Sequence, residues 1–154
     1  MMLKHKLHAL GAVVTALLLV TFWSATLMSE LFLTLSAIAQ VKLGIAFAIP
    51  LLVVAMAMTA ATGMSMGGKS RHPLLVAKRG RMPYLAVNGL LILVPSAMFL
   101  AFRASAGTFD TWFYVVQALE LVAGAINITL IGLNCRDGIR VRRRHAPSKP
   151  GLSS

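Results

Sequence analysis

Long apolar blocks, separated by short polar segments, constrain this 154-residue sequence more than any other feature. They run over about 7–28, 41–62, 83–102 and 111–133. At about 1.5 Å per residue, each block forms a helix that can cross a hydrocarbon core of about 30 Å. A helix that is apolar all round has to be buried in protein or in lipid, and this chain has too few other residues to bury several such helices. The sequence therefore predicts an all-α polytopic membrane protein, a bundle of four transmembrane helices.

Composition supports the same prediction. Apolar residues make up 58% of the chain and charged residues only 12%, against about 25% charged in typical soluble proteins. We expect 1–145 to form a single transmembrane domain and the Pro/Ser/Gly-rich end, 146–154, to be a disordered cytoplasmic tail. Lys4 and Lys6 precede the first block, as in a secretory signal peptide, but the block exceeds the about 7–15 apolar residues of such peptides. A retained first span is therefore expected, although its cleavage stays open.

The basic residues predict the orientation of the spans. All Lys and Arg residues except Lys42 and Arg103 fall in the first, central and last polar segments. Because positively charged flanks stay on the cytoplasmic side, both termini are expected in the cytoplasm of a bacterial-type inner membrane. Trp23, Trp112 and Tyr114 fall near the predicted outer ends, where amphipathic aromatic rings settle. The net charge of +11 thus indicates topology and attraction to membrane lipids, and no nucleic-acid partner is expected.

Polar residues and prolines predict where the helices begin and end. Ser29 and Glu30 are expected at the first turn, followed by 31–40 as an interfacial or tilted lead-in to the second span. Pro83 suits the first helical position of the third span, where a missing N–H costs little. Asp110 is expected, like Glu30, to be a turn or capping residue near the outer surface.

The last block carries the most specific pattern of the sequence. Six of its residues follow spacings of 3, 4, 3, 4 and 3, which places them on one stripe of a helix; they are Gln117, Glu120, Gly124, Asn127, Ile131 and Asn134. Most are polar, and the glycine lets another backbone come close. This polar seam is therefore expected to face protein rather than lipid.

Glu120 lies deepest among the carboxylates, about 13 Å from the outer end of its span by helical rise. We expect it to pair with Lys42, whose long stem can reach inward, or with Arg103 at the outer rim. Asn88, early in the third span, is expected to join the network near the cytoplasmic side. The predicted intramembrane polar network consists of Gln117, Glu120, Asn127, Asn134, Asn88 and Lys42, with Gly124 as a helix-packing position.

Two interpretations of this network follow. In the functional one, the polar groups handle protons or a small cation, or line a cavity for a small ligand. In the structural one, they make interhelical hydrogen bonds worth only about 0.6 kcal/mol each. The sequence favours the structural interpretation.

Metal, haem and thiol chemistry find little support. Met56 and Met58 are two residues apart, so they point away from each other on a helix and cannot share a copper ion. No histidine falls inside a predicted span, and only His8, at the edge of the first, could point inward, so haem is not expected. Cys135 is the single cysteine. No cofactor and no metal are therefore expected.

No catalytic motif is present, which leaves an enzymatic role open but favours a non-enzymatic one. The leading hypothesis is an accessory, assembly or stabilising subunit of a larger membrane complex, in contact with other integral membrane subunits or with itself. The alternative is a small oligomeric transporter or channel that moves protons or a small cation through a site containing Glu120. A membrane-bound immunity-type protein is a third hypothesis.

Overall fold

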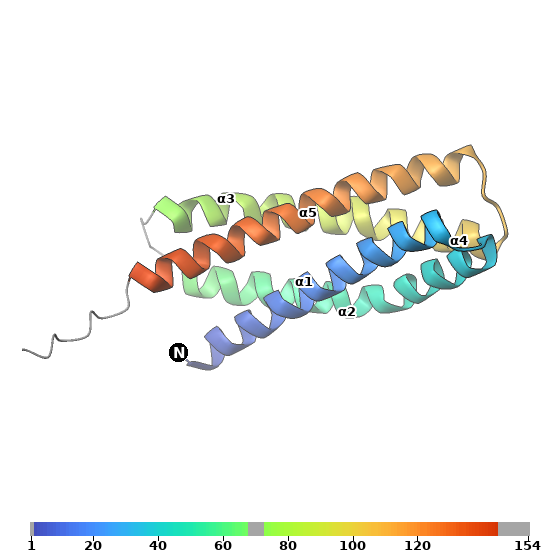
Figure 1. The fold of residues 1–154 in the computed structure, drawn as a ribbon. Helices are drawn as coiled ribbons and strands as arrows, with labels where there is room; N and C mark the ends of the chain where they lie inside the picture. The colour runs from blue at the N-terminus through green and yellow to red at the C-terminus, as the bar shows by residue number, and fades with distance from the viewer. Residues whose placement is uncertain (1, 68–72, 145–154) are drawn as a thin grey trace, which may run out of the picture.

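The computed structural model describes residues 2–67 and 73–144, and this part of the chain is helical apart from two short connections. The tail expected to be disordered, 146–154, lies outside the described residues. The elements are α1 (Met2–Phe32), α2 (Leu35–Gly67), α3 (Pro73–Val87), the π-helical segment η1 (Asn88–Leu93), α4 (Val94–Ser105) and α5 (Thr111–Arg144). Because α3, η1 and α4 follow one another without a break, the described chain makes four rods (Figure 1).

Each rod contains a stretch that is long and apolar enough to cross a membrane. The four stretches are Leu3–Phe32, Leu35–Ser65, Gly80–Ser105 and Thr111–Arg140. The four apolar blocks expected from the sequence lie within them, so the all-α class and the four spanning-length helices are confirmed for the described residues. Even the shortest stretch, of 26 residues, is about 39 Å long at about 1.5 Å per residue, longer than a hydrocarbon core.

The first two helices are joined later than predicted. Ser29 and Glu30 lie inside α1, and the Ser29 hydroxyl donates to a backbone carbonyl of its own helix at 2.9 Å. The break comes at Thr34, whose Oγ1 accepts a hydrogen bond from the backbone N–H of Ala37 at 3.4 Å, as an N-cap residue does. The predicted turn at Ser29 is therefore wrong, and most of the expected lead-in, 31–40, is helical and continuous with the rest of α2.

The third rod begins at Pro73 rather than at the predicted Pro83, which lies inside α3. Pro73 instead occupies the first helical position, where a missing N–H costs little. Further along, the rod widens into η1, and the backbone N–H of Val94 donates to the carbonyl of Gly89. Pro95 follows directly and has no N–H to donate. A wide turn is one of the ways in which a helix accommodates such an interruption.

The connection between α4 and α5 is held by its charged residues. Gly107 adopts a φ of 67°, which a residue without a Cβ reaches at little cost. The backbone N–H of Phe113 donates to Asp110 Oδ1 at 3.0 Å, and the Arg103 guanidinium donates to the other carboxylate oxygen. These donors, Arg103 foremost, hold the pKa of Asp110 below its ordinary value. The prediction that Asp110 caps the last helix is confirmed.

The rods pack as a closed ring. Helix α1 contacts α2 and α5, and α4 completes the ring by contacting the same two helices from the other side, while α3 packs on α5. Each rod contributes one residue to a buried apolar cluster that consists of Leu19, Leu52, Leu93 and Ala123. The ring thus encloses a narrow core at mid-length.

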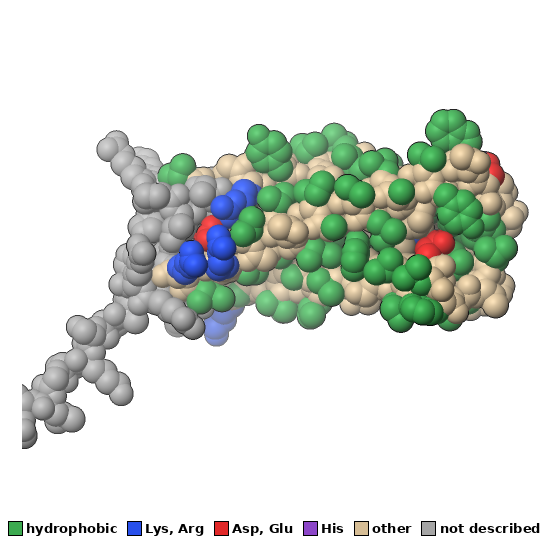
Figure 2. All heavy atoms as spheres, turned by 45° about the horizontal axis from the view of Figure 1, so that its top comes forward, with side chains coloured by type: hydrophobic (Ala, Val, Ile, Leu, Met, Phe, Trp, Pro, Cys, Tyr) green, Lys and Arg blue, Asp and Glu red, His purple; other side chains and the backbone are tan. Residues whose placement is uncertain are grey.

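The outer surface of the ring is apolar over most of its length. Every rod exposes large apolar side chains, among them Leu17, Phe47, Leu91 and Val122, and Phe47 is 79% exposed. Figure 2 shows hydrophobic side chains along the molecule and Lys and Arg side chains gathered at one end. Soluble monomers rarely expose apolar surface of this extent.

The two ends of the bundle differ in charge. The start of α1, the end of α2, the start of α3 and the end of α5 lie at one end (Figure 1), which we call the basic end. Its described charged residues include Lys4, Lys6, Arg136 and Arg140. The opposite end, which we call the turn end, holds the two short connections, 33–34 and 106–110.

Candidate functional site: a buried charge cluster and two polar contacts along the last helix

An ion pair lies inside the bundle. Lys42 Nζ, from α2, is 2.7 Å from Glu120 Oε2, from α5, and the two side chains are 1% and 12% exposed. The same ammonium donates to the hydroxyl of Thr26, from α1, at 3.3 Å. The predicted Lys42–Glu120 pair is therefore confirmed. The predicted alternative partner, Arg103, pairs instead with Asp110.

Gln117 completes the polar environment of Glu120 from one turn away on the same helix. Its Nε2 donates to Glu120 Oε2 at 3.3 Å, so that this one carboxylate oxygen accepts hydrogen bonds from both an ammonium and an amide. Gln117 is 4% exposed. Its Oε1 is buried and has no hydrogen-bond donor among the residues described.

Glu30 is a third ionisable group at this place, and sequence analysis did not assign it to the site. It lies near the end of α1, close enough to interact electrostatically with both Lys42 and Glu120. Its Oε1 is buried without a hydrogen-bond partner in the described part of the chain. The prediction that Glu30 is a turn or capping residue is wrong, because α1 continues past it to Phe32. We call Glu30, Lys42 and Glu120 the charge cluster.

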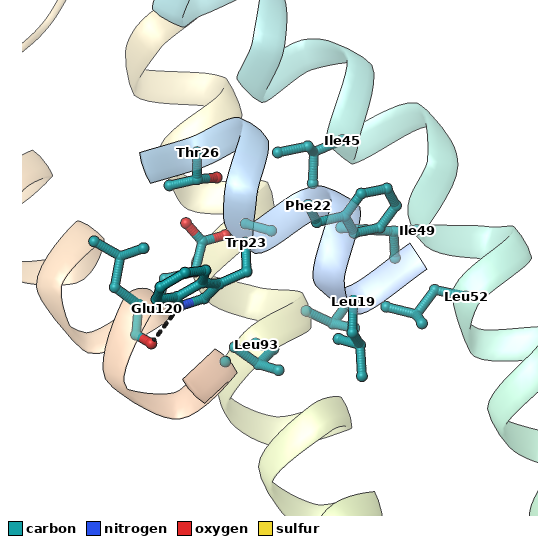
Figure 3. Close-up of a pocket in the computed structure, with 13 residues that line it drawn as sticks. Leu19, Phe22, Trp23, Thr26, Ile45, Ile49, Leu52, Leu93 and Glu120 are labelled. Atoms are coloured by element: carbon teal, nitrogen blue, oxygen red, sulfur yellow. Dashed lines mark hydrogen bonds between the residues drawn. The ribbon is translucent and has the colours of Figure 1, made fainter. Parts of the chain in front are cut away.

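Trp23 joins α1 to α5 beside the charge cluster. Its Nε1 donates to the backbone carbonyl of Leu121 at 2.9 Å, as Figure 3 shows. A Cβ at Gly124 would lie 2.9 Å from Trp23 Cδ1, closer than real contacts allow. The absence of a side chain at Gly124 is therefore what lets the indole reach this carbonyl.

A cavity of about 40 Å³ opens next to Trp23 and Glu120 (Figure 3). Besides these two residues, Thr26 is the polar side chain in its lining. The remainder of the wall consists of glycine and apolar side chains from all four rods: Leu19, Phe22, Ile45, Ile49, Leu52, Leu93, Val94, Ala97, Leu121 and Gly124. A cavity of this volume is too small for an organic substrate, and its largely apolar wall offers a water molecule few hydrogen-bond partners.

A second polar contact lies near the middle of α5. Asn88 Nδ2, at the first residue of η1, donates to Asn127 Oδ1 and to the carbonyl of Ala123, both at 2.8 Å. Asn127 is fully buried. A Cβ at Gly89 would lie 3.5 Å from Asn127 Nδ2, so the backbone of η1 passes close to the amide. The expected contact between Asn88 and the polar seam is confirmed.

A third polar contact lies toward the basic end. Arg81 Nη1 donates to Asp137 Oδ2 at 2.7 Å and lies 3.5 Å from Asn134 Oδ1. Asp137 is 3% exposed in this pair. Sequence analysis included Asn134 but missed Arg81 and Asp137, although Asp137 follows Asn134 by three residues on the same face.

The predicted network is thus three separate contacts rather than one. Lys42 lies with Gln117 and Glu120, Asn88 lies with Asn127, and Asn134 lies with Arg81. The polar seam faces other rods of the same chain, as predicted. It is consequently not a surface that could contact another subunit.

His8 lies away from the charge cluster, near the other end of the bundle (Figure 1). His8 Nδ1 is 3.1 Å from the carbonyl of Thr59 and 3.2 Å from Thr62 Oγ1, so it links α1 to α2 near the basic end. His72 and His145 lie outside the described residues. Within 2–67 and 73–144, no group of three or more His, Cys, Asp or Glu side chains could hold a metal ion.

No family model, no curated protein and no solved structure matches this chain. The function therefore has to be inferred from the chain's own residues.

The charge cluster predicts an asymmetry between its members. Lys42→Met leaves Glu120 without its cation inside the bundle and should lower the free energy of unfolding by about 3–5 kcal/mol, as loss of one partner of a buried pair does. Glu120→Gln should cost less, because Glu30 remains as a partner for Lys42. Unfolding in mixed detergent, followed by circular dichroism, measures both. Lys6→Met, at the exposed basic end, serves as the control and should be near neutral. Equal losses for Lys42→Met and Glu120→Gln would contradict a role for Glu30.

The contact between Gly124 and Trp23 gives a second prediction. Gly124→Ala should displace the indole, break its hydrogen bond to Leu121 and lower the free energy of unfolding by about 1–3 kcal/mol. Trp23 fluorescence, measured in a Trp112→Phe background, should change its emission maximum. Gly132→Ala is the matched control on the same helix, because its new Cβ meets nothing within 4 Å. The same response in both variants would rule out the proposed contact.

Proposed function

We propose that this protein is a multi-pass protein of a bacterial-type inner membrane, with both termini in the cytoplasm. Four apolar rods of membrane-spanning length support insertion, since a continuous apolar surface is stable in lipid and unstable in water. The gathering of Lys and Arg at one end supports the orientation, because positively charged flanks stay cytoplasmic. The basic end is then cytoplasmic and the turn end faces the opposite side.

Single-cysteine labelling tests this orientation. In a Cys135→Ser background, Thr108→Cys places a thiol in the connection at the turn end, and Arg140→Cys places one at the basic end. A membrane-impermeant maleimide added to intact spheroplasts should label Thr108→Cys and spare Arg140→Cys. Both should react after the membrane is permeabilised, which controls for access. The reverse pattern in intact spheroplasts would contradict the proposed orientation.

Within that membrane, the protein serves as a non-enzymatic accessory or stabilising subunit of a larger complex. One observation carries this proposal: the deepest charges of the bundle, Lys42 and Glu120, are paired with each other at 2.7 Å. Charges that are paired within the bundle favour a role in fixing its packing over an open path or a substrate site. The outward apolar side chains of all four rods supply the contact surface for other membrane helices.

Native mass spectrometry of the particle extracted from its own membrane in mild detergent tests this role. We expect other integral membrane subunits to co-purify in fixed ratio. Lys42→Met should reduce the recovery of the assembled particle, since it loosens the bundle that partners bind, and Lys6→Met should leave recovery unchanged. A particle that contains only copies of this chain would contradict the accessory role.

A second candidate function is transport of protons or a small cation, and Glu30 is the observation that favours it. Lys42 and Glu120 already neutralise each other, so the nearby Glu30 is an ionisable group that the packing of the bundle does not require. In this case the purified protein should conduct in vesicles, and Glu120→Gln should abolish the flux. An accessory subunit should show no flux in either form.

A further inference from the structure

Two arginines from different rods meet at one buried carboxylate near the basic end. Arg81, from α3, donates to Asp137 Oδ2 at 2.7 Å, and Arg136, from α5, places its Nε 3.5 Å from Asp137 Oδ1. Asp137 is 3% exposed, whereas the side chains of Arg81 and Arg136 are 26% and 52% exposed. The carboxylate is therefore enclosed, while both arginine side chains remain partly open to the surroundings. We call Arg81 and Arg136 the arginine pair.

The arginine pair carries more charge than its carboxylate neutralises. Two guanidiniums meet one carboxylate, which leaves one positive charge uncompensated. The other three carboxylate side chains of the sequence, Glu30, Asp110 and Glu120, lie toward the turn end. Exposed cations at the basic end, where Lys and Arg side chains gather (Figure 2), add to the excess: Lys4, Lys6 and Arg140. An anion that balances this charge has to come from outside the described chain.

Both guanidiniums have hydrogen-bond donors to spare. A guanidinium offers five N–H donors in a planar fork. Arg81 uses Nη1, which donates to Asp137 and lies 3.5 Å from Asn134 Oδ1, and Arg136 faces Asp137 through Nε. Two parallel N–H donors of such a fork match two oxygen atoms of a phosphate, and this match makes arginine the usual phosphate-binding residue. Phosphate is therefore the anionic group that the arginine pair suits best.

Inserted as proposed, the arginine pair lies at the depth of lipid phosphates. The stretch Thr111–Arg140 has 30 residues, so at about 1.5 Å per residue it extends about 7 Å beyond each face of a core of about 30 Å. Arg136, one turn before its end, then lies about 2 Å outside the core. Arg81, next to the start of Gly80–Ser105, lies about 3 Å outside on the same basis. Tyr84, one turn further along α3, is 71% exposed, and tyrosine rings settle at this boundary.

The surroundings favour a lipid over a soluble phosphate. Toward the middle of the bundle, the third rod exposes Val87 and Leu91. On α5, Gly132 lies one turn before Arg136 on the same face, and a Cβ there would meet nothing within 4 Å. Acyl chains can therefore lie against these helices below a bound phosphate. A zwitterionic headgroup brings its own cation, which the excess positive charge repels, whereas an anionic lipid brings none.

We propose that the arginine pair binds the phosphate of an anionic phospholipid in the leaflet at the basic end, with Asp137 holding the two guanidiniums side by side. The inference rests on the proposed membrane insertion, but neither on the accessory role nor on transport. It gives part of the positive charge at this end a specific ligand, beyond its effect on orientation.

Lipid titration of the purified full-length protein in detergent, followed by native mass spectrometry, tests the site. Phosphatidylglycerol and phosphatidylcholine with the same acyl chains are added in equal amounts. The wild type should bind one phosphatidylglycerol molecule more tightly than any phosphatidylcholine. Arg136→Gln should lower the association constant for phosphatidylglycerol about fivefold, the effect of one basic residue near a membrane surface. Its association constant for phosphatidylcholine should not change.

Two matched variants separate a built site from diffuse attraction. Arg136→Lys keeps the charge but loses the planar fork, so its association constant for phosphatidylglycerol should lie between those of the wild type and Arg136→Gln. Lys6→Gln removes the same charge from another exposed residue of the basic end and should lower the constant less than Arg136→Gln does. Circular dichroism checks that each variant retains its helices.

Equal affinity of the wild type for the two lipids would overturn the proposal, whether or not any variant folds. Equal losses in folded Arg136→Gln and Lys6→Gln, or an Arg136→Lys protein that binds like the wild type, would overturn it too. Flotation of the wild type with vesicles of phosphatidylcholine alone tests insertion separately. A protein that floats with these vesicles but shows no preference for phosphatidylglycerol would contradict the lipid site and leave the membrane proposal standing.

Discussion

The ion pair between Lys42 and Glu120 is the contact on which the arrangement of the bundle depends. Apolar side chains are as stable against lipid as against one another, so apolar surface alone does not fix how spanning helices are rotated or shifted. A buried ammonium and a buried carboxylate are different, because each is costly wherever it does not meet the other. Their contact at 2.7 Å fixes how α2 is rotated relative to α5. The hydrogen bond from Lys42 to Thr26 fixes the position of α1 relative to both helices.

Helix α5 is the element to which the other rods attach. Its polar seam, continued by Asp137, contacts a different element at each level: α2 near the turn end through Glu120, η1 at mid-length through Asn127, and α3 near the basic end through Asn134 and Asp137. Between the first two levels, the absence of a side chain at Gly124 leaves room for the ring of Trp23 from α1. Three polar contacts at different depths determine both the position and the tilt of a rod, which one contact cannot do.

The sequence predicts well those features that one helix carries by itself. The apolar blocks give the four rods, and the 3-4 spacing in α5 gives its buried face, because both follow from the geometry of a single helix. The pairing of Lys42 with Glu120 was also predictable, since few cations lie near a buried carboxylate. Glu30 was missed because its partners come from α2 and α5, and nothing in its own helix indicates them.

Helix ends were predicted less well, for a related reason. Ser29 and Pro83 are ordinary signals of a turn or a helix start, but each is accommodated inside a helix. The Ser29 hydroxyl binds a carbonyl of its own turn. Pro83 lacks the N–H that would donate within α3. Membrane helices tolerate such a proline where a neighbouring helix packs on them, as α5 packs on α3. At both positions, packing against neighbouring helices overrides the local signal for a turn or a helix start.

The wide turn at η1 has a consequence for how the third rod is built. A residue added to one turn of a helix rotates everything after it by about 100°, close to a quarter of a revolution. Before this turn α3 packs mainly on α5, whereas after it α4 packs on both α2 and α5. A one-residue step in the sequence thereby shifts the helical phase of α4 relative to that of α3.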